Sequence, residues 1–225
     1  MFKPSVNITE QIADFLEEKI VTGELKGGAR IQEVKLAKEL SVSRGSVREA
    51  LLILERRHLI DVVPRKGAVV HSMSQQDAIE VLELLALMER RYLPTCLNNT
   101  TLLTSLMEPL NGLEAAAKAS DLQASLEHRA AFYQCLLQDA PRYAKTVFAS
   151  LLPSSQRVYF TLLQKTDLDL YDIARYYGAL TCAMKDGSQA RLEELVNACS
   201  RRIVDLCEDS LSSRGANDAR YAVNQ

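Results

Sequence analysis

Positively charged side chains are concentrated in one short stretch of the chain. Residues 44–66 contain six Lys and Arg against three Asp and Glu, and the six are Arg44, Arg48, Arg56, Arg57, Arg65 and Lys66. Such groups bind phosphate oxygens, and a guanidinium also forms paired hydrogen bonds with the edge of guanine. The whole chain has a net charge of −2. This local excess of positive charge therefore indicates nucleic acid only if the fold presents it on one face.

Two short helices are predicted before these cations. Apolar residues recur at helical spacing after Asn7, which can cap the first helix, and Gly23 ends it. A second helix is expected over residues 32–40, with Val34 among the residues on its buried side.

A third helix carries the first cations at its start. Ser43 can cap it after a tight turn, and its inward face follows from apolar residues at i, i+3, i+4 and i+7 between Val47 and Leu54. Arg44 and Arg48 are left on the outer side of its N-terminal end. This pattern is typical of a helix-turn-helix, in which that end of the helix reaches base edges in the major groove.

A β-hairpin is predicted directly after the third helix. Residues 59–63 and 68–71 are rich in β-branched residues, and the turn between them, residues 64–67, carries Arg65 and Lys66. A wing of this kind lies along the DNA backbone or minor groove, where cations meet phosphates.

The rest of the chain is predicted to be helical. We expect a DNA-binding domain over residues 1–73, a helical domain over 74–212 and a flexible tail over 213–225. Pro94 and Pro153 should kink or break their helices. The six helices predicted in the second domain span approximately 75–97, 101–119, 121–138, 141–165, 168–185 and 188–212.

Residues 42–51, Val-Ser-Arg-Gly-Ser-Val-Arg-Glu-Ala-Leu, resemble the GntR superfamily of bacterial transcription regulators, and the resemblance extends over residues 7–72. The helical remainder resembles the FCD-type (FadR C-terminal) effector domain, in its VanR-like subgroup. The implied fold is mainly α, with an N-terminal winged helix-turn-helix and a C-terminal all-α domain of six helices. The resemblance implies DNA-binding roles for Lys35, Ser43, Arg44, Ser46, Arg48, Arg65, Lys66 and Gly67.

Some positions depart from the family pattern. The family's arginine near the start of the second helix corresponds to Val34, and His58 stands where a helix-ending glycine is usual. We interpret His58 as a structural residue, because a residue other than glycine can adopt the left-handed conformation at some cost.

The helical domain departs further, at the positions that bind a metal in most FCD domains. By the resemblance, the effector pocket is lined by Leu85, Arg129, Tyr133, Tyr177 and Cys199, where relatives have metal ligands or a pocket arginine. Residues 74–225 contain only one histidine, His128, so no metal and no cofactor is expected. Arg129 could bind an anionic group directly; alternatively it lies on the surface or in a salt bridge, and the tyrosines fill the core.

The sequence is compatible to different degrees with three functions. The first is a transcription regulator, a cytoplasmic homodimer on double-stranded operator DNA, controlled by a small anionic or amphipathic metabolite. The second is a regulator whose helical domain only dimerises. The third, an enzyme, is disfavoured because no GxSxG, P-loop, GxGxxG, HExxH or CxxC motif is present. No stretch approaches the length of about 20 apolar residues that a membrane helix needs, and the five cysteines are interpreted as free thiols.

Overall fold

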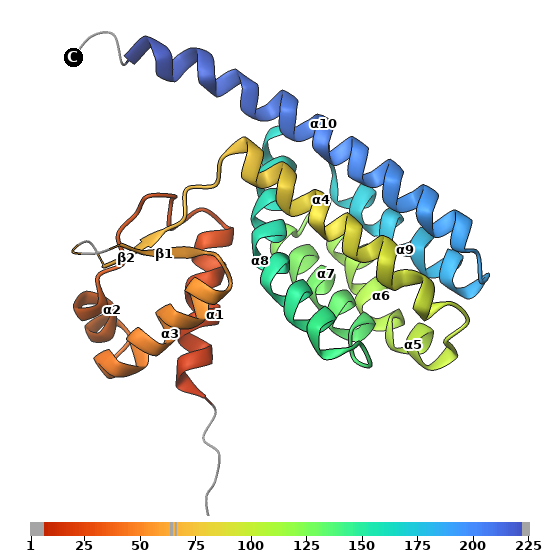
Figure 1. The fold of residues 1–225 in the computed structure, drawn as a ribbon, viewed down its shortest axis with the longest axis horizontal. Helices are drawn as coiled ribbons and strands as arrows, with labels where there is room; N and C mark the ends of the chain where they lie inside the picture. The colour runs from red at the N-terminus through yellow and green to blue at the C-terminus, as the bar shows by residue number, and fades with distance from the viewer. Residues whose placement is uncertain (1–6, 64, 66, 222–225) are drawn as a thin grey trace, which may run out of the picture. The chain divides into compact units, whose positions relative to one another are not determined.

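The structure, a computed structural model, describes residues 7–63, 65 and 67–221, with side chains described as far as residue 209. The chain divides into two compact units, one of Met1–Ser74 with Ala149–Arg157 and the other of Gln75–Phe148 with Val158–Gln225. The mainly α fold class is confirmed (Figure 1). In the described part of the chain, no helix is long and apolar enough to cross a membrane.

The first unit contains the three predicted helices, α1 (Ile8–Val21), α2 (Glu33–Glu39) and α3 (Arg44–Arg56). The Asn7 side chain caps α1 by accepting a hydrogen bond from the Thr9 backbone N–H. The core that joins the helices includes the fully buried Leu16, Val47 and Leu54. Val34 does not lie on the buried side of α2 as predicted, because its side chain is 59% exposed.

The predicted wing is also present. β1 (Ile60–Val63) pairs antiparallel with β2 (Gly67–Val70), with Ile60 opposite Val70. Before it, α3 ends at a turn in which His58 is left-handed, with φ of 56°. This agrees with the structural interpretation of His58. At the tip of the wing, Pro64 and Lys66 lie outside the described residues.

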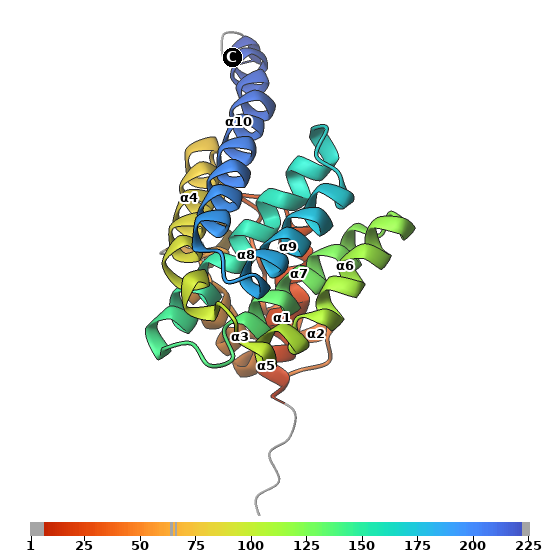
Figure 2. The same ribbon diagram turned by 90° about the vertical axis from the view of Figure 1, so that its right-hand side faces the viewer.

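The second unit is a bundle of helices that pack around one another (Figures 1 and 2). α10 runs along both α4 and α9. Pro94 breaks the first expected helix, so that α4 is followed by the 3-10 helix η1. Pro153, by contrast, lies inside the continuous helix α8. The elements are α4 (Gln75–Tyr92), η1 (Leu93–Cys96), α5 (Thr100–Ser105), α6 (Met107–Ala119), α7 (Leu122–Leu136), α8 (Arg142–Lys165), α9 (Leu170–Lys185) and α10 (Gln189–Tyr221). The middle of α8, Ala149–Arg157, is counted with the first unit.

Two boundaries differ from the prediction. The helix expected over 101–119 is divided into α5 and α6, so the described part of this unit has seven α-helices rather than six. Pro109 fits this division, since it has no N–H to donate to the preceding turn and lies in the first turn of α6, where that N–H is not needed. In addition, α10 continues to Tyr221, although a tail was expected from residue 213. Each added residue extends a helix by one backbone hydrogen bond, and no proline interrupts this segment. Residues 222–225 lie outside the described residues.

Candidate nucleic-acid interface and effector site

Ser43 caps the N-terminal end of α3, which is exposed to solvent. The Ser43 hydroxyl accepts a hydrogen bond from the Ser46 backbone N–H at 3.0 Å, and the two hydroxyls lie 2.9 Å apart. The cap begins the helix at Arg44 while Val47 and Ala50 anchor its inner face. Arg44 and Arg48 are consequently exposed on the outer face. The positive end of the helix dipole lies at the same place and also favours phosphate.

Two carboxylates lie beside the predicted DNA-binding cations. The Arg48 Nη2 atom donates to Glu33 Oε2 on α2 at 3.1 Å. Lys35 Nζ lies 3.8 Å from Glu39 Oε1, and both of these side chains are exposed. Arg44 has no hydrogen bond or ion pair with any residue that the structure describes. Exposed ion pairs are weak, so phosphate or base contacts can replace them at small cost.

At the wing, two predicted residues share an unusual backbone conformation. Arg65 has φ of 66° and Gly67 has φ of 78°, and both are exposed. The two positive φ values turn the chain tightly between β1 and β2, which presents the Arg65 side chain at the tip. Lys66, the other predicted cation of the tip, lies outside the described residues.

In the helical domain, the structure brings three of the predicted effector residues together. Arg129 and Tyr133 on α7 and Tyr177 on α9 are almost completely buried. Arg129 Nε donates to the Tyr177 hydroxyl at 2.9 Å, and the Tyr177 hydroxyl donates to the Tyr133 hydroxyl at 3.2 Å. The guanidinium carbon also lies 4.3 Å from the centre of the Tyr159 ring. Arg129 is therefore not on the surface, and aromatic groups of its own chain surround it.

A buried carboxylate, Glu89, completes this network. It accepts hydrogen bonds from the Tyr133 hydroxyl and, at 3.0 Å, from the Tyr176 hydroxyl. Burial raises the pKa of Glu89, while the hydrogen bonds from the two tyrosines and the charge of Arg129 act in the opposite direction. Burial lowers the pKa of Arg129, but the three tyrosines around it and Glu89 raise this pKa by more. The net shift is upward, and the guanidinium stays protonated.

Glu89, Tyr159 and Tyr176 were not predicted from the sequence. A signal for Glu89 exists, since it continues the buried side of α4 formed by Ala78, Leu82, Leu85 and Ala86. A charged residue in such an apolar stripe indicates a buried partner. Leu85, the predicted pocket residue, lies one turn before Glu89 and is also buried. Cys199 on α10 is half-buried, with its Sγ atom 4.0 Å from the Tyr159 hydroxyl.

These residues do not fit the metal that the family resemblance implies. A metal ion prefers anionic or neutral ligands. The Arg129 guanidinium instead places a positive charge among the positions that correspond to the metal ligands of relatives. Burial raises the pKa of Tyr177 and of Cys199 to about 12. Among the described residues, no group of three His, Cys, Asp or Glu is placed to hold a metal ion.

Comparison with known proteins identifies the DNA-binding part. Residues 8–70 match the family of bacterial regulatory proteins named gntR. The gluconate operon transcriptional repressor of Bacillus licheniformis is 37% identical over 79 residues, which are 35% of this chain and 32% of the repressor. The transcriptional regulator McbR of Escherichia coli is 29% identical over 120 residues, which are 52% of this chain and 54% of McbR. These relatives are named as transcription regulators rather than enzymes.

The solved structure of E. coli McbR/YncC has the same fold over both units. The TM-score is 0.74 at 20% sequence identity, and the alignment covers 91% of this chain and 99% of that structure. In sequence, however, this chain spans only 32% to 54% of the length of the two relatives named above. The family match itself covers only the N-terminal domain. That domain, residues 8–70, is a helix-turn-helix domain of the GntR family.

Proposed function

We propose that this chain is a transcription regulator that binds a pseudo-palindromic operator as a homodimer and responds to a small metabolite through its helical domain. The observation that carries the proposal is the exposed, cationic start of α3 in a GntR-family domain. Arg44 and Arg48 would contact bases and phosphates in the major groove, and the wing would contact the flanking backbone. Because the gluconate relatives are named as repressors, we propose repression in the cytoplasm.

Dimerisation is supported by an apolar surface on α4. Leu84 and Leu87 are 41% and 55% exposed, although leucines on a helix normally face the core. They lie close together on the outer side of α4, whose inner side packs on α10. A second copy can cover the same residues on both chains, as a two-fold symmetric interface requires.

The ligand-independent alternative also has support. The side chains at three predicted pocket positions, Arg129, Tyr133 and Tyr177, form hydrogen bonds with one another and with Glu89. Because these side chains fill the centre of the domain, this alternative gives the domain a role in dimerisation without a ligand. Titration with small molecules distinguishes the two, and an effector needs only about 1–3 kcal/mol of coupling to change DNA affinity usefully.

The proposed DNA binding is tested by selection from a library of randomised DNA duplexes. The full chain should enrich sequences with two related half-sites about one helical turn apart, and gel-shift assays should show saturable binding to them. Retention of duplexes without any sequence preference would contradict the proposal.

A further inference from the structure

The helical domain has a cavity beside the buried network of Arg129 and Glu89. It has a volume of 340 Å³ and lies between α9 and α10. Its walls are largely apolar and include Leu168, Ile173, Leu195 and Ile203. Tyr159, Tyr176, Tyr177 and Cys199 also line it. Tyr176 and Tyr177 belong to the network around Glu89, so the cavity adjoins that network. A volume of this size suits a small organic molecule.

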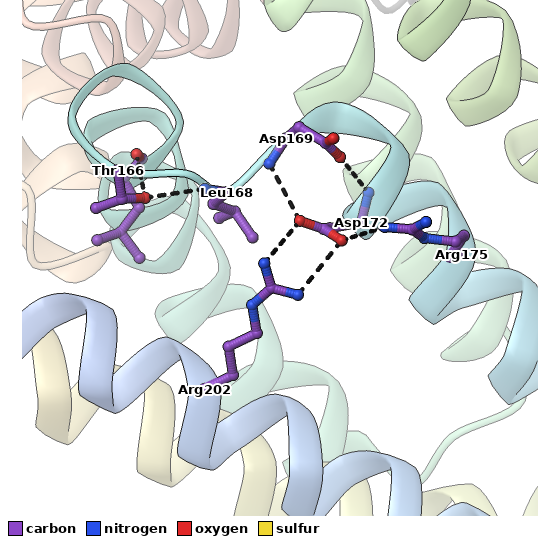
Figure 3. A network of polar contacts seen from close by, with 7 residues as sticks. Thr166, Leu168, Asp169, Asp172, Arg175 and Arg202 are labelled. Carbon is purple, nitrogen blue, oxygen red and sulfur yellow. Dashed lines mark hydrogen bonds and ion pairs between the residues drawn. The ribbon is translucent and has the colours of Figure 1, made fainter.

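The charged groups that line this cavity carry one excess positive charge. They are Asp172, Arg175 and Arg202 (Figure 3). Arg202 Nη2 donates to Asp172 Oδ2 at 3.0 Å, and Arg202 Nη1 lies 3.4 Å from Asp172 Oδ1. Arg175 donates to the same Oδ1 atom. Two guanidinium groups therefore share a single carboxylate.

Asp172 is held in place independently of the arginines. It forms a capping box with Asp169 at the start of α9, in which the Asp172 backbone N–H donates to Asp169 Oδ1 at 2.7 Å. The Asp169 backbone N–H donates in return to Asp172 Oδ2 at 3.3 Å. Only 12% of the Asp172 side chain is exposed, against 50% for Arg202 and 72% for Arg175. A guanidinium has five N–H donors, and each of these two arginines uses only part of them on Asp172. Asp172 therefore competes with a ligand for the two guanidinium groups but leaves N–H donors on both.

From this arrangement we infer that the cavity binds an amphipathic monocarboxylate. Its apolar body lies between Leu168, Ile173 and Leu195, and its carboxylate binds Arg202 and Arg175. One excess positive charge matches one negative charge, and apolar walls disfavour a highly hydrated dianion. This inference rests on the proposed function, because the ligand would be the effector of the same regulator. A ligand there would act on α10, which also packs along α4, the helix that follows the DNA-binding domain in the chain.

Octanoate is a suitable probe, with octanol and octylamine as matched uncharged and cationic molecules. Calorimetric titration of the full chain should show saturable binding of one octanoate per chain. Octanol and octylamine should bind at least ten-fold more weakly. Equal affinity for octylamine, or no saturable octanoate binding, would overturn the inference.

Three variants test the assignment to these residues. Arg202→Gln should weaken octanoate binding at least ten-fold, and Arg202→Lys should restore part of the loss. Arg201→Gln is the matched control, since Arg201 is the exposed neighbour on α10 and does not line the cavity. Equal weakening by the Arg201 and Arg202 variants would count against the site. Thermal unfolding of each variant verifies that it is folded.

Asp172→Asn should have the opposite effect. The amide keeps an oxygen for the capping box but removes the negative charge that competes for the arginines, so octanoate should bind more tightly. Weaker binding to this folded variant would contradict the proposed head-group site. Selection of DNA duplexes, run in parallel, separates the two proposals. Duplex selection without octanoate binding rejects this inference alone, whereas octanoate binding without duplex selection rejects the proposed regulator alone.

Discussion

Arg48 is the residue at which the proposed DNA contact is most directly testable. Its guanidinium is exposed on the outer face of α3 and its ion pair with Glu33 is at the surface. Arg48→Ala should weaken binding to a selected duplex at least ten-fold, since one bidentate arginine–guanine pair contributes about 1–3 kcal/mol. Thermal stability should hardly change, because exposed ion pairs contribute at most about 1 kcal/mol.

Arg56 provides the control for this measurement. It is exposed on the last turn of the same helix, away from the end that carries Arg48. Arg56→Ala should reduce gel-shift affinity much less than Arg48→Ala. Unaltered affinity in the Arg48 variant would show that another element reads the DNA.

Arg129 should be essential to the folded helical domain. Its guanidinium is completely buried together with the Glu89 carboxylate. Arg129→Met should lower the free energy of unfolding by about 3–5 kcal/mol, because it leaves a buried carboxylate without its positive charge. The measurement is urea unfolding of the full chain. The double variant Arg129→Met, Glu89→Gln should lose less than the sum of the two single variants. A loss below about 1 kcal/mol in the Arg129 variant would contradict the role assigned to this network.

At the scale of elements, the turn after α3 stores backbone strain at His58. The residue is left-handed, with φ of 56°, and a side chain in this conformation costs roughly 1–2 kcal/mol. His58→Gly should therefore raise the free energy of unfolding, by about 1 kcal/mol once the greater freedom of glycine in the unfolded chain is deducted. Urea unfolding measures the change. His58→Ala, which keeps a β-carbon, should give no such gain, and equal gains in both variants would refute the explanation.

The wing should contribute to affinity through phosphate contacts. Arg65 is exposed at the tip between β1 and β2. Arg65→Ala should weaken binding to different duplexes by similar factors and reduce the slope of log affinity against log salt by about one unit. Gel shifts at a series of salt concentrations measure both. A change confined to one DNA sequence would indicate base reading by the wing instead.

At the scale of the whole molecule, the α4 surface is predicted to join two copies. Glu83 and Arg91 lie four residues on either side of Leu87 and are exposed. In an antiparallel pair of α4 helices centred on Leu87, Glu83 would face the partner subunit's Arg91. Leu87→Asp should convert the dimer to a monomer at micromolar concentration, as measured by light scattering. Met107→Asp, which changes an exposed apolar residue of α6, is the control and should leave the dimer intact. If the Leu87→Asp variant is still a dimer, the α4 surface is not the interface.

The helix-turn-helix was predictable from sequence because its determinants are local. Caps at Asn7 and Ser43, apolar spacing along α3 and turn residues in the wing act over a few positions of the chain. They identify the elements and the outward side of α3 before any tertiary contact is considered. Val34 was wrongly predicted as buried because α2 is short, and its two faces are distinguished only by the helices packed against it.

The arrangement within the helical domain was decided by tertiary structure alone. Glu89, Arg129 and Tyr177 lie on three different helices and are 40 or more residues apart in sequence. No local pattern in the sequence predicts that α4, α7 and α9 bring them into one buried network. The same holds for Arg202 and Asp172, which meet only because α10 packs on α9. The sequence by itself determined which residues each helix carries; the packing of the helices decided that Arg129 is enclosed and that Arg202 lines an accessible cavity, because burial depends on neighbours that are distant in the chain.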